Sequence, residues 1–269
     1  MAFSDGSVQF HERPEGGWFD PTEQPPPPCG CEETRCSYNS CPYRPVNRPP
    51  APIQEAEGLQ QDLRKRLLSV GRALLDQERA EVLVEPRARE TGFWFGGGDI
   101  ARAPDGTLWL CGRYRNGGDS RVGIEAGPRG AELALLRSTD GGQTFEQAFS
   151  FLKKDLTCDG EEVLSIEGAS LHLADGYAEL YVSTEKVRAY PERVRKFQKE
   201  GTGVWSIDVL SAGRPEDLAG ASPRSVLRSD QPSWLHVKDP VVFDLGGRRT
   251  MLYCSHPYCW SSSGTGYAV

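Results

Sequence analysis

The spacing of hydrophobic residues changes along this 269-residue chain and divides it into regions. Between residues 55 and 80, apolar side chains recur every three or four positions, with charged side chains elsewhere around the wheel. The apolar positions are Leu59, Leu63, Leu67, Val70 and Leu74. This spacing is typical of an amphipathic α-helix. We expect the helix to pack its leucine stripe on the next domain, with binding to a partner as the alternative.

From about residue 81 the pattern changes to short β-rich runs broken by Gly, Asp and Asn, and one unit recurs. Its copies begin at Asp99, Gly168 and Asp239, which are 69 and 71 residues apart. Each copy leads into an Asp-Gly or Gly-Gly turn, and such turns are strong signals of a β-hairpin. The strands expected after the turns are Thr107 to Tyr114, Ala178 to Thr184 and Arg249 to Ser255.

Further strands complete each unit. They are expected at Ala131 to Ser138, Thr144 to Phe151, Gly203 to Leu210, Ser225 to Arg228 and Gly266 to Val269. Four antiparallel strands, repeated about every 70 residues, are typical of a β-propeller with long blades. A sandwich would not repeat its hairpins so evenly, and a parallel α/β fold would need a helix between strands. We therefore predict an all-β fold in which residues 81–269 form about two and a half blades of a β-propeller.

Residues 1–54 differ in composition, because 11 of the 20 prolines fall within residues 1–52. Proline donates no backbone hydrogen bond and the segment has little to bury, so we predict a disordered Pro/Cys-rich leader. The leader also holds four thiols within 13 residues, those of Cys29, Cys31, Cys36 and Cys41. Four thiolates suit a tetrahedral zinc ion. Their spacing fits neither common paired pattern, so a structural zinc and unliganded thiols both stay open.

Charge and composition narrow the function. A net charge of −7 and a pI near 5.3 provide no basic patch for nucleic acid. The sequence contains no apolar run of about 18 residues, the length that predicts a membrane span. The start, Met1 to Phe10, does not read as a secretory signal. We therefore expect a cytoplasmic protein whose eight cysteines are thiols or metal ligands rather than disulfides. The sequence leaves the oligomeric state open.

One short motif resembles a known family. Residues Ser138 to Phe145 read Ser-Thr-Asp-Gly-Gly-Gln-Thr-Phe. This matches the Asp-box, Ser-x-Asp-x-Gly-x-Thr-aromatic, of sialidases and related propellers. The motif is structural, because the Asp side chain caps a turn and Gly allows a positive φ. The stretch from Gly97 to Phe145 likewise resembles the first blade of bacterial sialidase-like enzymes.

A second resemblance, to five-bladed fructosidases and arabinanases, rests on the step Lys238-Asp239-Pro240. Gly97-Gly98-Asp99 stands where sialidases carry Arg-Ile-Pro, which favours the five-bladed glycosidases. The resemblance covers about residues 90–269. Because five blades of about 70 residues need about 350, it implies either that the chain is truncated or that another chain completes the ring.

The inner strands begin with three acidic residues, Asp99, Glu167 and Asp239, spaced 68 and 72 residues apart. Inner strands of a propeller all start on one face beside the axis, so these carboxylates would converge. Glycoside hydrolysis needs one carboxyl group as acid and another as base or nucleophile. The resemblance implies that Asp99 is the base or nucleophile and that Asp239 orients the sugar and tunes the acid. Glu167 is then the acid, unless a carboxylate outside the chain takes that role. A turn-capping role is the alternative for each.

Other side chains expected on this face are candidates for substrate binding. They are Arg113, Arg115, Asp119, His236, His256, Trp94 and Trp260. The histidines are candidates to hydrogen-bond sugar hydroxyls, and the tryptophans to stack on a sugar face. Asp119 is the acid if the sialidase resemblance is the better guide. A solvated or packing role is the alternative for each.

The sequence thus predicts a glycoside hydrolase-like protein that cleaves a glycosidic bond with a carboxylate acid/base pair at the propeller axis. No cofactor is required, and the expected partner is a carbohydrate. Two alternatives stay open because a propeller hosts many functions. One is a non-catalytic propeller that binds carbohydrate or protein on the same face, and the other is an exo-sialidase.

Overall fold

A computed structural model describes residues 60–116, 130–198, 202–230, 234–256 and 264–269. The chain divides into two units, Cys29–Leu83 and a second made of Met1–Pro28 with Val84–Val269. We describe each by itself. The Pro/Cys-rich leader of residues 1–54, with its four cysteines, lies outside the described residues.

The smaller unit contains the predicted helix, α1 (Gln61–Leu74), followed by the 3₁₀ turn η1 (Gln77–Arg79). Asp62 lies in the first turn of α1 and Arg72 in the last, where each complements the helix dipole. The described members of the leucine stripe have exposed side chains in this structure: Leu63, Leu67, Val70 and Leu74. Packing of that stripe on the next domain therefore stays an expectation. No helix in the described part of the chain is both long and apolar enough to cross a bilayer.

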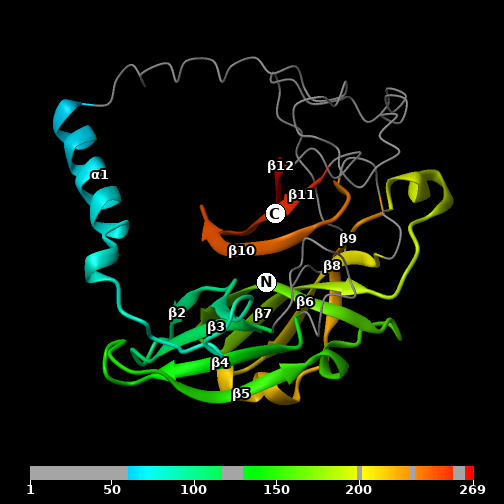
Figure 1. The fold of residues 1–269 in the computed structure, drawn as a ribbon, viewed down its shortest axis with the longest axis horizontal. Coiled ribbons are helices and arrows are strands. Elements are labelled where there is room, and N and C mark those ends of the chain that lie inside the picture. The colour runs from blue at the N-terminus through cyan, green and yellow to red at the C-terminus, as the bar shows by residue number, and fades with distance from the viewer. Residues whose placement is uncertain (1–59, 117–129, 199–201, 231–233, 257–263) are drawn as a thin grey trace. The chain divides into compact units, whose positions relative to one another are not determined.

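The larger unit is all-β, as predicted, and forms successive antiparallel sheets (Figure 1). The first contains β1 (Trp94–Gly96), β2 (Ile100–Arg102), β3 (Leu108–Arg115), β4 (Glu132–Ser138) and β5 (Glu146–Leu152). The second contains β6 (Val163–Ala174), β7 (Tyr177–Lys186), β8 (Val204–Ala212) and β9 (Arg224–Arg228). The third contains β10 (Lys238–Leu245), β11 (Arg248–Ser255) and β12 (Gly264–Ala268). Short 3₁₀ helices lie in the connections: η3 (Lys153–Leu156), η4 (Glu192–Phe197) and η5 (Pro215–Gly220).

The strands of the second and third sheets pair in chain order, and in the first sheet β1 and β2 both pair with β3, which is followed by β4 and β5. Each sheet is therefore a meander, the form of a β-propeller blade. The three strands predicted after the hairpin turns and the five further strands all form, with ends within two residues of those expected. The sequence did not reveal β1, because its three residues are too few to show a period.

The sheets pack face to face through apolar side chains. Trp109, Leu133 and Leu135 of the first sheet lie in one buried cluster with Leu171 and Leu180 of the second. A further cluster joins the second sheet to the third. It contains Tyr181, Ile207, Val209, Val242, Met251 and Tyr253. Burial of these alternating residues holds β3, β6 and β10 next to one another, as successive inner hairpins of a propeller require.

Residues preceding β1 cover the other face of the first sheet. Val84, which precedes β1, packs together with Phe95 of β1 on a small cluster that includes Tyr114. The guanidinium of Arg87 lies 3.8 Å from the centre of the Tyr114 ring and its Nη2 lies 2.7 Å from Glu132 Oε1. The first sheet is therefore covered on both faces by the same unit.

The turn between β4 and β5 forms as the motif Ser138–Phe145 predicts. Asp140 accepts hydrogen bonds from the backbone N–H groups of Gln143 and Thr144, and from the Thr144 and Ser138 hydroxyls at 2.6 Å each. Gly141 and Gly142 have φ of 77° and 94°, which explains the need for glycine. The hydroxyl donors of Ser138 and Thr144 hold the pKa of Asp140 well below its ordinary value. The motif therefore forms a turn, and its link to sialidases remains a sequence resemblance.

Candidate functional site

All three inner strands carry a β-bulge at the same level, and the three predicted carboxylate residues lie in these bulges. In the second sheet, the pairs Ile166–Thr184 and Ala169–Val182 enclose two residues on β6 but one on β7. In the third, Lys238–Cys254 and Val241–Leu252 do the same for β10 and β11. In the first, three residues (97–99) separate β1 from β2, opposite two on β3. Bulges re-aim side chains and are frequent next to active sites.

Asp99 lies in the first bulge and its carboxylate joins two sheets. Oδ1 accepts the backbone N–H of Leu171 at 2.9 Å and the thiol of Cys111 at 3.2 Å. Oδ2 accepts the hydroxyl of Ser170 at 2.6 Å. The three donors fix the orientation of the carboxylate, and all three are neutral; no described cation forms an ion pair with it. Its neighbour Gly98 allows this approach, since a Cβ there would lie 2.0 Å from the Cys111 carbonyl oxygen.

Glu167 lies in the second bulge and is largely buried. Arg113 Nη1 lies 2.5 Å from its Oε2, and Ser165 donates to its Oε1 at 2.8 Å. The same Nη1 also donates to the Ile166 carbonyl oxygen at 2.9 Å, so the guanidinium joins β3 to β6. The Arg113 guanidinium also lies 5.1 Å from the centre of the Trp94 ring. Arg113 therefore contacts a candidate carboxylate rather than standing apart as a separate substrate ligand.

Asp239 lies in the third bulge with an exposed side chain and a φ of 54°. A left-handed conformation is uncommon for a residue other than glycine, although Asp tolerates it better than most. The Asp239 N–H donates to the Ser183 hydroxyl at 3.2 Å, and that hydroxyl donates to the Gly168 carbonyl at 3.1 Å. A Cβ on Gly168 would lie 2.7 Å from Asp239 Oδ1, so this side chain rests directly on the second bulge.

The bulges also touch one another. The Ala169 N–H donates to the Gly97 carbonyl at 2.8 Å, and a Cβ on Gly97 would lie 3.9 Å from the Gly168 Cα. Because Gly168 in turn supports Asp239, the first, second and third bulges form one continuous surface. The structure therefore brings the three predicted carboxylate residues to adjacent positions at the same end of neighbouring sheets.

The remaining substrate-binding candidates are placed differently. Arg115, at the end of β3, is buried and lies opposite Trp94 across the strand pair. Asp119 and Trp260 lie outside the described residues. His236 has no exposed surface. Its Nδ1 lies 2.7 Å from the Tyr190 hydroxyl, and burial is the main cause that lowers its pKa to about 2.

His256 is half-buried, with its ring 6.0 Å from that of His236. The backbone N–H of His256 donates to the Leu235 carbonyl at 2.8 Å, which fixes the end of β11. In this arrangement His236 has the packing role given above as the alternative, whereas His256 retains an exposed surface.

The described cysteines are free thiols in or beside strands. Cys111 is fully buried, as expected of a core position, and burial together with the Asp99 carboxylate raises the pKa of its thiol. Cys158 is buried next to η3, and Cys254 is half-buried in β11. Within the described ranges, no three His, Cys, Asp or Glu side chains are placed to hold a metal ion.

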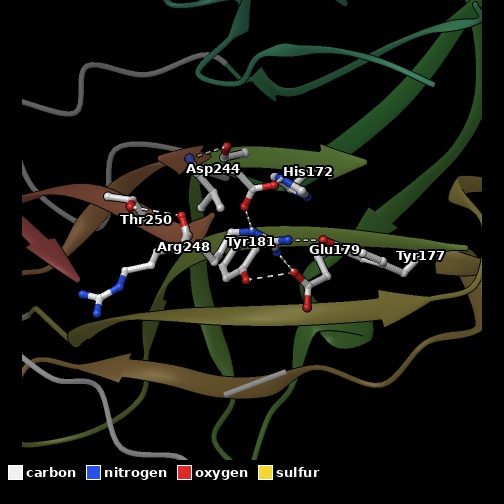
Figure 2. Close-up of polar contacts among 10 residues, drawn as sticks. His172, Tyr177, Glu179, Tyr181, Asp244, Arg248 and Thr250 are labelled. Atoms are coloured by element: carbon white, nitrogen blue, oxygen red, sulfur yellow. Dashed lines mark hydrogen bonds and ion pairs between the residues drawn. The ribbon is translucent and has the colours of Figure 1, made fainter. Parts of the chain in front are cut away.

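A second polar cluster lies at the opposite end of the inner strands, where the turns of β6–β7 and β10–β11 meet (Figure 2). Arg249 pairs with Asp244 at 2.8 Å and with Glu179, and it also donates to the Tyr177 hydroxyl. His172 Nε2 lies 3.1 Å from Asp244 Oδ2. The Arg249 contact is the principal cause that lowers the pKa of Asp244. Sequence reasoning missed this cluster, whose only signal was an arginine just after the Gly-Gly turn.

No protein-family profile and no curated protein matches the chain. Solved structures do match it. An exo-1,5-α-L-arabinanase from a bovine ruminal metagenomic library has a TM-score of 0.44 at 13% identity, over 71% of this chain and 57% of that chain. An α-L-arabinanase from Cellvibrio cellulosa has a TM-score of 0.42 at 11% identity, over 70% and 57%. A GH43 β-xylosidase/α-arabinofuranosidase from a compost microbial metagenome has a TM-score of 0.40 at 15% identity, over 64% and 46%. The chain thus spans about half the length of these structures.

Proposed function

We propose that this protein is a glycoside hydrolase whose carboxylates act at the bulged ends of the inner strands. One observation carries the proposal: Asp99, Glu167 and Asp239 come from three different sheets, yet each lies in a bulge and the bulges touch. Hydrolysis of a glycosidic bond canonically uses two carboxyl groups, one that protonates the leaving oxygen and one that activates water or attacks from the opposite face of the sugar ring. Three of them on one continuous surface meet that need, and the arabinanase-like Asp239-Pro240 step agrees with it.

The contacts distinguish the roles. The carboxylate of Asp99 accepts three hydrogen bonds that hold its orientation, which suits a base or nucleophile. Asp239 is the most exposed of the three and is the residue that orients the sugar. Glu167 is the acid when substrate replaces Arg113 as its partner, or else it holds Arg113 in place for an acid from elsewhere.

A second function, binding of carbohydrate without turnover, is favoured by a specific contact. Both oxygens of Glu167 already have hydrogen-bond partners, Arg113 and Ser165. A carboxylate satisfied in this way is a structural element of a binding face as readily as an acid. The two functions share the same surface and differ in whether a bond is cleaved.

The test is turnover by the intact protein on aryl glycosides and on arabino-, xylo-, fructo- and sialyl-oligosaccharides. We expect Asp99→Asn to reduce turnover by at least about 1,000-fold, because loss of a catalytic carboxylate removes several kcal/mol of transition-state stabilisation. Asp105→Asn is the matched control, since Asp105 only caps a turn by accepting the Thr107 N–H at 2.9 Å. Normal turnover by Asp99→Asn would exclude Asp99 from the mechanism. Sugar binding by a wild type that cleaves nothing would favour the second function.

A further inference from the structure

A single buried hydroxyl, that of Ser170 on β6, links all three sheets. Ser170 has no exposed surface. Its Oγ lies 2.6 Å from Asp99 Oδ2 in the first sheet and 3.0 Å from the backbone nitrogen of Val242 in the third. The contacts therefore run from β10 through β6 to the candidate base.

The direction of these hydrogen bonds is fixed by their chemistry. A backbone N–H only donates, so the Ser170 oxygen must accept from Val242. The hydroxyl has one proton, and Asp99 is the acceptor that lies within reach of it. Because the N–H occupies a lone pair of the oxygen, the proton is directed at Oδ2 rather than rotating among partners. The 2.6 Å distance is typical of a hydroxyl that donates to a carboxylate.

The other carboxylate oxygen of Asp99 is held independently. Oδ1 receives the Leu171 N–H and the Cys111 thiol. The Leu171 N–H is part of a strand backbone, and a thiol is a weak donor. Ser170 is therefore the one strong side-chain donor to Asp99 among the described residues, and the only contact that connects Asp99 to the third sheet, where Asp239 lies.

We propose that Ser170 is the positioning residue of Asp99: it sets the orientation of the carboxylate and ties it to the sheet that carries Asp239. This inference rests on the proposed function, because Asp99 is the base only if a glycosidic bond is cleaved. The neighbouring Ser183 makes a similar bridge, but it ends on a carbonyl oxygen instead of a carboxylate. The bridge through Ser170 is thus the one that reaches the reacting group.

Ser170→Ala removes the hydroxyl donor and changes the packing of the buried site very little. We expect its kcat to fall about 10- to 100-fold while KM changes less than about threefold, because a misplaced catalytic group loses orientation but not substrate contacts. The acid limb of the pH–rate profile should move to higher pH, since the ionised carboxylate has lost a donor. Ser170→Thr keeps the hydroxyl and should restore most of kcat. The matched control is Ser206→Ala, because Ser206 is as buried in the same sheet and contacts no part of Asp99.

Unfolding temperatures give a readout that needs no activity. Ser170→Ala should lower the unfolding temperature in the wild-type background and much less in an Asp99→Ala background, because the contact is already lost there. Equal decreases in both backgrounds would overturn the inference, as would an active Ser170→Ala with wild-type kcat and pH profile. A wild type without turnover on any glycan would instead overturn the proposed function, and the positioning role with it.

Discussion

The two ends of the inner strands contain similar residues in different electrostatic arrangements. At the turn end, Glu179 and Asp244 share one buried cation, Arg249, which joins the second and third sheets. At the bulged end Glu167 has a cation, Arg113, but Asp99 receives only neutral donors, and no described cation forms an ion pair with Asp99 or with Asp239. Compensated charge cross-links two sheets, whereas uncompensated charge on a rigid frame can act on a ligand. Under the proposed function, we therefore expect the turn end to stabilise the fold and the bulged end to carry the chemistry.

Removing the cation of the turn end should have the largest effect on stability. In Arg249→Met the largely buried Glu179 and the half-exposed Asp244 both lose their cation, so the free energy of unfolding should fall by about 2–3 kcal/mol, most of it from Glu179. Turnover at moderate temperature should be unchanged. Chemical denaturation measures this, and Arg248→Met, an exposed neighbour in the same turn, should unfold like the wild type. Loss of turnover without loss of stability in Arg249→Met would contradict the roles assigned to the two ends.

At the bulged end, Gly168→Ala should affect turnover more than stability, the reverse of what we expect for Arg249→Met. The added Cβ would lie 2.7 Å from Asp239 Oδ1 and 3.0 Å from its Cα, so the third bulge must move. We expect a stability loss of about 1–2 kcal/mol and a loss of turnover larger than that stability change explains. Kinetics and unfolding on the same samples separate the two. Gly213→Ala is the control, since its Cβ would meet nothing within 4 Å. Unaltered turnover in Gly168→Ala would mean that Asp239 is not in the site.

Acid should lower the free energy of unfolding over two pH ranges, the first through His236 near the bulged end and the second through Asp244 at the turn end. His236 lies just before the third bulge, and its pKa in the fold is about 2 against an ordinary 6.5. Below pH 6.5 the unfolded chain binds a proton that the folded chain does not, so stability falls with pH by at most about 1.4 kcal/mol per pH unit. His236→Gln should reduce the slope of the unfolding free energy against pH, measured between pH 6.5 and 4.5. An unchanged slope would contradict the buried neutral ring.

The smallest effect is expected from Asp244 at the turn end. Its pKa in the fold lies below the ordinary 3.8, so its contribution is complete above pH 3.8 and is lost as pH falls below that value. The side chain is half-exposed, and solvent screening keeps the contribution small. Asp244→Asn should therefore alter stability only at the acid extreme. A change at neutral pH would contradict the assignment of this contribution to the Asp244 carboxyl group.

The fold was largely predictable from the sequence, because a hairpin turn and its flanking strands are encoded by neighbouring residues such as Asp105-Gly106. The shared position of the three acidic residues at the start of the inner strands was also predictable, because it follows from the repeat. Their partners were not. The contacts of Asp99 with Ser170 and of Glu167 with Arg113 join residues 71 and 54 positions apart, and they depend on how sheets pack. The sequence left sugar binding and packing both open for His236, because one histidine between strands shows no period.

The bulge at Gly98 has a consequence for how freely this sequence can vary. With any side chain at this position, a Cβ would lie 2.0 Å from the Cys111 carbonyl and the strands would separate. Gly213 and Gly220, by contrast, face open space and tolerate substitution. In a library of random variants selected for function, position 98 should therefore accept only its native residue, and descendants of this protein are free to drift in their loops but not at this crossing of two backbones.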